Sequence, residues 1–136
     1  MTEAALRAVP EGSWTARNLR AALDVAARTP RPLLGRALHD TVVVAHYPWT
    51  DLAPEAVALA FAAYAAGGGE VEASVVTAAN LGRDADTTAA VAGALAGAGR
   101  ARRRCPRAGP SASARWRAGA CRWSPDGTSA TSPTRS

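Results

Sequence analysis

The chain has 136 residues, enough for one small domain, and its formal net charge of +5 is unevenly distributed. Residues 1–99 carry seven arginines and ten acidic residues, whereas residues 100–136 carry nine arginines and one acidic residue. No stretch reaches the ~20 apolar residues of a membrane span, and the N-terminus lacks the apolar core of a secretory leader. We therefore expect a cytoplasmic protein with no membrane partner.

Residues 14–28 are predicted to form a helix. Ser13 is a suitable N-cap, and Leu19 and Leu23 lie four positions apart on the stripe expected to face the core. Two prolines then end the helical pattern. The following stretch, residues 33–39, is expected to add one or two further helical turns.

The run Val42–Val44 is too short to distinguish a strand from a buried helix, and both alternatives stay open. The clearest helix of the sequence is residues 53–66. Pro54 suits a first helical position, Glu55 suits the first turn, and the glycines at 67–69 end the segment. Because this helix is apolar on nearly every face, we expect it to be buried.

Two further helices are predicted, over residues 70–82 and from Asp86 or Thr87 onward for about thirteen residues. Gly93 and Gly97 lie four positions apart in the second of them, which indicates close packing against another helix. The inward positions of the first are expected to be Val71, Val75 and either Ala78 or Ala79.

Residues 100–136 differ in composition from the rest of the chain. They contain no Leu, Ile, Val, Phe or Met, and their large apolar side chains are Trp116 and Trp123. Such a segment buries too little apolar surface to offset its ordering entropy, so we predict a disordered tail. Both cysteines, Cys105 and Cys121, lie there without metal-binding spacing. The whole chain lacks Lys, Ile and Gln, as a GC-rich gene would, and we hypothesise that the tail comes from a shifted reading frame.

Asp84, Asp86 and Thr87 place two carboxylates and a hydroxyl within one short segment before a helix. Hard oxygen donors of this kind suit Mg²⁺, Mn²⁺ or Ca²⁺. Aspartates at a helix start more commonly cap free N–H groups and complement the helix dipole. The spacing alone favours capping over a metal site.

The longer sequence "NLGRDADTTAAVAGALAGA", residues 80–98, resembles the C-terminal motif of the ADP-ribosylglycohydrolase family. The sequence from residue 53 onward is also similar to that family. The resemblance implies an all-α fold, here a partial orthogonal helical bundle formed by residues 1–99. It also implies a centre of two metal ions, usually Mg²⁺ with Mn²⁺ as an alternative. The family hydrolyses the bond that joins ADP-ribose to a protein side chain or a related group, so ADP-ribose or an ADP-ribosylated protein is the expected partner.

The resemblance assigns Asp84, Asp86 and Thr87 to metal-ligand positions. The chain departs from the family pattern at Arg83, where many members have glycine, and at Ala85, where many have threonine. Arg83 is our candidate for substrate binding, through a phosphate of the ligand. Three further residues match motif positions with structural roles: Asn80, Gly82 and Gly93.

The remaining parts that the resemblance implies are missing from the sequence. It contains neither G-D-x-x-G nor T-D-D, and we assign neither Asp40-Thr41 nor Thr50-Asp51 as metal ligands. His39 and His46 are interpreted as ordinary histidines. We assign no catalytic residue. The chain is therefore expected to be an inactive C-terminal fragment of the enzyme, with a companion chain as one source of the missing half.

Two alternatives remain beside this interpretation. The chain could be a non-catalytic helical scaffold in which the aspartates only cap a helix. The basic tail, with Arg102–Arg104 and two tryptophans, could instead contact nucleic acid. Its arginines have no regular spacing, so we do not expect nucleic acid as a partner.

Overall fold

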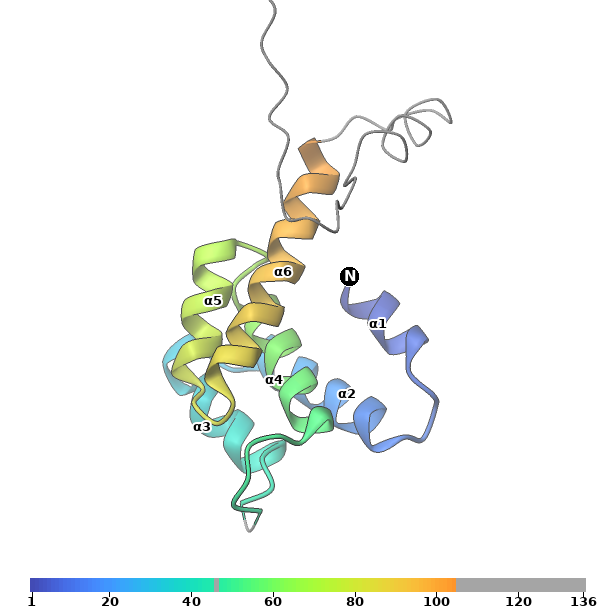
Figure 1. Cartoon of the computed structure of the whole chain (residues 1–136), viewed down its shortest axis with the longest axis vertical. Coiled ribbons are helices and arrows are strands. Elements are labelled where there is room, and N and C mark those ends of the chain that lie inside the picture. Colours follow the sequence, from blue (N-terminus) through green and yellow to red (C-terminus); the bar gives the residue numbers. More distant parts are fainter. Residues whose placement is uncertain (46, 105–136) are drawn as a thin grey trace, which may run out of the picture. The chain divides into compact units, whose positions relative to one another are not determined.

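A computed structural model describes residues 1–45 and 47–104 of the chain (Figure 1). This part contains six α-helices and no strand, which confirms the all-α prediction. The predicted disordered tail from residue 105 onward, with both cysteines and both of its tryptophans, lies outside the described residues, and so does His46. The helices are α1 (Thr2–Ala8), α2 (Trp14–Arg28), α3 (Arg31–Thr41), α4 (Ala53–Ala66), α5 (Val71–Asn80) and α6 (Ala85–Arg104).

Helix α2 has the predicted bounds and the predicted cap. The Ser13 hydroxyl accepts a hydrogen bond from the backbone N–H of Ala16 at 3.1 Å, which satisfies one of the free donors of the first turn. Leu19 and Ala22 are fully buried, and this face of α2 packs against α4. The predicted core-facing stripe is confirmed at Leu19, whereas Leu23 is only half-buried.

Helix α4 also has its predicted bounds, and it packs against α2, α5 and α6 (Figure 1). Its buried side chains are mostly alanine, which lets three neighbours approach closely. At its end, a Cβ placed on Gly67 would lie 2.5 Å from the Ser74 hydroxyl oxygen and 2.8 Å from the Ser74 nitrogen. Glycine is thus required where the chain turns from α4 into α5. The buried core positions of α4 are Ala58, Leu59, Ala60, Ala62 and Ala63.

Several elements differ from the sequence-based expectation. Helix α1 was not predicted, and α3 is longer than the expected segment 33–39. Val42–Val44 forms neither a strand nor a helix, because α3 ends at Thr41 and the chain continues as a connecting segment in which Val42 is buried. Helix α6 begins at Ala85 and continues to Arg104, five residues past the expected domain limit at residue 99. Alanine and arginine are strong helix formers, which accounts for the extension.

The two glycines of α6 have different surroundings. A Cβ on Gly93 would lie 2.9 Å from Cγ2 of Val75 in α5, whereas a Cβ on Gly97 would meet no atom within 4 Å. Close packing against α5 therefore explains Gly93 but not Gly97. No helix in the described ranges combines the length and the apolar character that crossing a bilayer requires.

We predict opposite effects for alanine at these two positions. Gly97→Ala should raise the free energy of unfolding by about 0.5–1 kcal/mol, because alanine restricts the unfolded chain and favours helix. Gly93→Ala gains the same helix propensity, but its Cβ forces the stiff Val75 side chain to shift. The free energy of unfolding of Gly93→Ala should therefore be about 1–2 kcal/mol lower than that of Gly97→Ala. Urea unfolding of the two variants measures the difference. Equal stability of the two would contradict the packing assigned to Gly93.

Candidate metal centre

The acidic motif lies on a sharp bend between α5 and α6. Gly82 and Arg83 both have left-handed backbone conformations, with φ of +71° and +58°. Two successive residues of this kind turn the chain so that α6 starts beside the end of α5 (Figure 1). Glycine adopts this conformation freely, whereas an arginine is strained there and needs compensating contacts.

Asp84 and Asp86 bring their carboxyl groups together at the start of α6. The hydrogen bond with the Asp84 carboxyl, with help from the backbone N–H groups of Asp86 and Thr87, lowers the pKa of Asp86 below its usual value. The backbone N–H groups of Asp86 and Thr87 belong to the first turn of α6, so the Asp86 carboxylate also complements the positive end of the helix.

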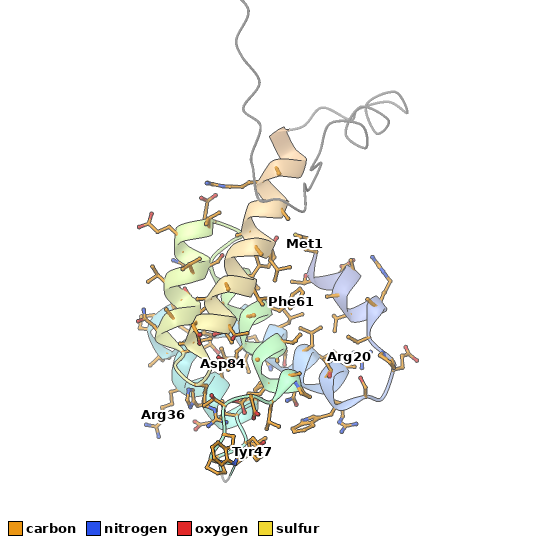
Figure 2. The ribbon with its side chains drawn as sticks, in the orientation of Figure 1. Met1, Arg20, Arg36, Tyr47, Phe61 and Asp84 are labelled. Carbon is orange, nitrogen blue, oxygen red and sulfur yellow. The ribbon has the colours of Figure 1, made fainter. Side chains whose placement is uncertain are left out.

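A pocket of about 220 Å³ opens beside this bend. Asp84, Thr87 and Thr88 line one side of it, and Asp51 lies on the opposite wall at the start of α4. Figure 2 shows Asp84 at the base of α6. Asp86 is exposed and is not part of the pocket wall. The remaining lining residues are apolar: Ala53, Ala56, Val57 and Val91.

Asp51 is held by Tyr47 of the segment between α3 and α4. The Tyr47 hydroxyl donates a hydrogen bond to Oδ1 of Asp51 at 3.3 Å. Desolvation and the Asp51 carboxylate raise the pKa of the Tyr47 phenol above its usual value. The Tyr47 hydroxyl thus helps to orient the Asp51 carboxylate.

A buried ion pair connects the bend to α4. The Glu55 side chain is 1% exposed, and its Oε1 accepts a hydrogen bond from Nε of Arg83 at 2.6 Å. Its Oε2 accepts from the backbone N–H of Val44 at 3.1 Å and from Nη2 of Arg83 at 3.3 Å. Nη2 of Arg83 also donates to the carbonyl oxygen of Trp49 at 3.0 Å. These contacts compensate the strained backbone of Arg83 and neutralise the buried carboxylate.

The other end of the bend is fixed by α3. Nε2 of His39 forms a hydrogen bond of 2.8 Å with the carbonyl oxygen of Leu81. The hydroxyl of Thr88, which is fully buried, donates to the carbonyl oxygen of Asp84 at 2.9 Å. The bend is therefore held from both sides. His39 thus has a structural contact, in keeping with its interpretation as an ordinary histidine.

The sequence-based site residues lie close together in the structure. Asp84 and Asp86 converge, and Thr87 is exposed beside them. The guanidinium group of Arg83 points into the ion pair with Glu55, and its role in substrate binding stays a prediction. Asp51 was considered from the sequence but not assigned to the site, and Glu55 was expected only to suit a first helical turn. The available signal for Glu55 was its position as the one charged residue in an otherwise apolar helix.

The donor set fits a hard divalent cation in part. Two carboxylates and one hydroxyl are the oxygen ligands that Mg²⁺ and Mn²⁺ prefer. Within residues 1–45 and 47–104, however, no three histidine, cysteine, aspartate or glutamate side chains converge on one point. The described residues therefore supply only part of a coordination sphere.

We predict that Arg83→Met lowers the free energy of unfolding by about 3 kcal/mol, because it leaves the Glu55 carboxylate buried without its cation. Adding Glu55→Gln should recover at least ~1 kcal/mol, since the amide oxygen can still accept from Val44 while the unpaired charge is removed. Urea denaturation of the wild type, the single variant and the double variant checks this. A double variant less stable than Arg83→Met would contradict the assignment of the loss to an unpaired charge.

The comparisons with known proteins concern the family of the chain. The family model of ADP-ribosylglycohydrolase matches residues 1–122, which include the bend, the ion pair and the pocket. Comparison with curated proteins and with solved structures gave no match. A match over most of the chain shows the family, and the chain therefore belongs to the ADP-ribosylglycohydrolase family.

Proposed function

We propose that this chain contributes Asp84, Asp86 and Thr87 to a divalent-metal site that hydrolyses the glycosidic bond between ADP-ribose and an acceptor. The observation that carries the proposal is the position of Asp84 and Thr87 on a pocket wall at the start of α6, in a chain of this family. Mg²⁺ is the expected ion, and Mn²⁺ satisfies the same oxygen donors.

The residues of the bend have separable tasks in this proposal. The Asp84 and Asp86 carboxylates and the Thr87 hydroxyl would hold the ion, which, when bound, orients ribose hydroxyls and a water and supplies positive charge near the leaving group. Thr88 fixes the Asp84 backbone and so limits the directions open to its carboxylate. Ala56, Val57 and Val91 add apolar side chains to the pocket wall.

This chain on its own should bind the ion weakly and should not turn over substrate. Few anionic oxygens converge in the described part, and each missing carboxylate removes attraction that offsets dehydration of the ion. A companion chain with further acidic ligands would complete the site. ADP-ribose or an ADP-ribosylated protein is the partner that the family suggests.

We predict that Mn²⁺ or Mg²⁺ raises the Tm of the chain through Asp84 and Asp86. An ion concentration ten times the Kd should add about 1.4 kcal/mol to the free energy of unfolding, because the ion binds the folded state alone. Asp84→Asn/Asp86→Asn should abolish the increase. Asp24→Asn/Asp40→Asn, which removes two exposed aspartates at other positions, is the matched control and should keep it. An increase that survives in the first variant would contradict the assignment.

We further expect the purified chain to release no ADP-ribose from an ADP-ribosylated protein, with or without Mg²⁺. The reason is the incomplete set of ligands in the described residues. Chromatographic detection of free ADP-ribose measures the release. Mg²⁺-dependent release that disappears in Asp84→Asn would show that this chain holds a complete site, and would overturn the expectation of inactivity while supporting the reaction.

A further inference from the structure

The segment between α3 and α4 has few backbone contacts of its own. Its backbone N–H groups at Val44 and Tyr47 are hydrogen-bonded, the first to Oε2 of Glu55 at 3.1 Å and the second to the carbonyl oxygen of Val44 at 2.9 Å. Val42 and Val43 at the start of the segment pack in the core, but Trp49 is 68% exposed, so side-chain burial contributes little near Trp49. Other groups must therefore keep this part of the segment in place.

Arg83 supplies those groups. Its guanidinium donates to Glu55 of α4 and to the carbonyl oxygen of Trp49, and it lies 3.5 Å from the carbonyl oxygen of Tyr47. The planar guanidinium can serve several acceptors at once, which a lysine cannot do. One side chain thus connects the acidic bend, α4 and the segment that carries Asp51.

The connection matters because both walls of the pocket depend on it. Asp84 directly follows Arg83, and Asp51 lies two residues after Trp49, whose carbonyl oxygen Arg83 binds. The backbone of Arg83, at φ +58°, is strained. When the guanidinium loses its partners, the backbone of Arg83 is therefore expected to move to a less strained conformation. Relaxation would move Asp84, and release of the segment would move Asp51.

We propose that Arg83 is a positioning residue: through its ion pair with Glu55 it directs Asp84 toward the pocket, and it holds the described residues of the 44–51 segment, of which Asp51 lines the pocket. It does not touch the ion. The part of this inference that concerns the ion rests on the proposed function, whereas the part that concerns residues 44–51 does not.

The test compares Arg83→Gln with Arg36→Gln in the full chain. Arg36 is a matched control, because its contact with Asp40 is exposed and far weaker at 3.9 Å. Two properties are measured: amide hydrogen exchange at Val44 and Tyr47 without metal, and Mn²⁺ affinity by electron paramagnetic resonance. For Arg83→Gln we expect exchange at both amides to accelerate at least about tenfold while the amides of α2 stay protected. We expect the Kd for Mn²⁺ to rise about tenfold or more. Arg36→Gln should change neither.

Two further variants separate positioning from general stability. Arg83→Lys keeps the charge but loses the planar set of donors, so it should give intermediate exchange and intermediate affinity. Glu55→Gln/Arg83→Gln leaves no buried charge unpaired and replaces the single variant if that variant does not fold.

Unchanged exchange at Val44 and Tyr47 in a folded Arg83 variant would overturn the inference, whatever the Mn²⁺ affinity. Accelerated exchange with unchanged Mn²⁺ affinity would also overturn it, since Arg83 would then only stabilise the segment. Accelerated exchange in a chain whose wild type binds no Mn²⁺ would support the link to residues 44–51 and would refute the metal site of the proposed function.

Discussion

Glu55 is the one charged residue of the otherwise apolar helix α4, and it places a carboxylate in the protein interior, where its side chain is 1% exposed. A carboxylate in that position is tolerated only with a cation and with hydrogen-bond donors for both oxygens. Arg83 and the backbone N–H of Val44 supply them. Arg83 directly precedes Asp84. The ion pair that neutralises Glu55 therefore also fixes the start of the acidic bend and places Asp84 on the pocket wall.

The same ion pair accounts for an unusual residue choice. Glycine would reach a left-handed conformation at position 83 without strain. Here the φ of Arg83 is +58°, and four hydrogen-bond acceptors around its guanidinium compensate the strain. The bend thus keeps a glycine-like backbone through side-chain contacts, at a position where the backbone alone would favour another conformation.

The helices that the sequence predicted to the residue are those with unambiguous ends. Ser13 caps α2, and Pro54 and Gly67 bound α4, so local chemistry decides those limits. Helix α1 has no side-chain cap and seven residues, so its pattern is too short to recognise. Val42–Val44 took neither expected form, because the course of that segment depends on Glu55, eleven residues away from Val44.

The site was predictable only where its residues are close in sequence. Asp84, Asp86 and Thr87 follow from a motif, whereas the pairing of Glu55 with Arg83 joins positions 28 residues apart. Read locally, Glu55 in a first turn complements the helix dipole. Glu55 is buried because α4 packs against the bend and against the segment before α4. No local sequence pattern predicts this burial. Asp51 was named in the sequence but not assigned to the site, because its place on the pocket wall depends on the course of the preceding residues.

The central claim is that Asp84 and Asp86 together hold a divalent cation. Paramagnetic broadening by substoichiometric Mn²⁺ in a two-dimensional NMR spectrum of the ¹⁵N-labelled chain tests it most directly, since the effect falls steeply with distance from the ion. The account predicts that the amide signals of residues 83–88 broaden first, together with that of Asp51 across the pocket. Broadening that begins at the exposed Glu70 and Glu72, or that spreads evenly over all acidic residues, would contradict the claim.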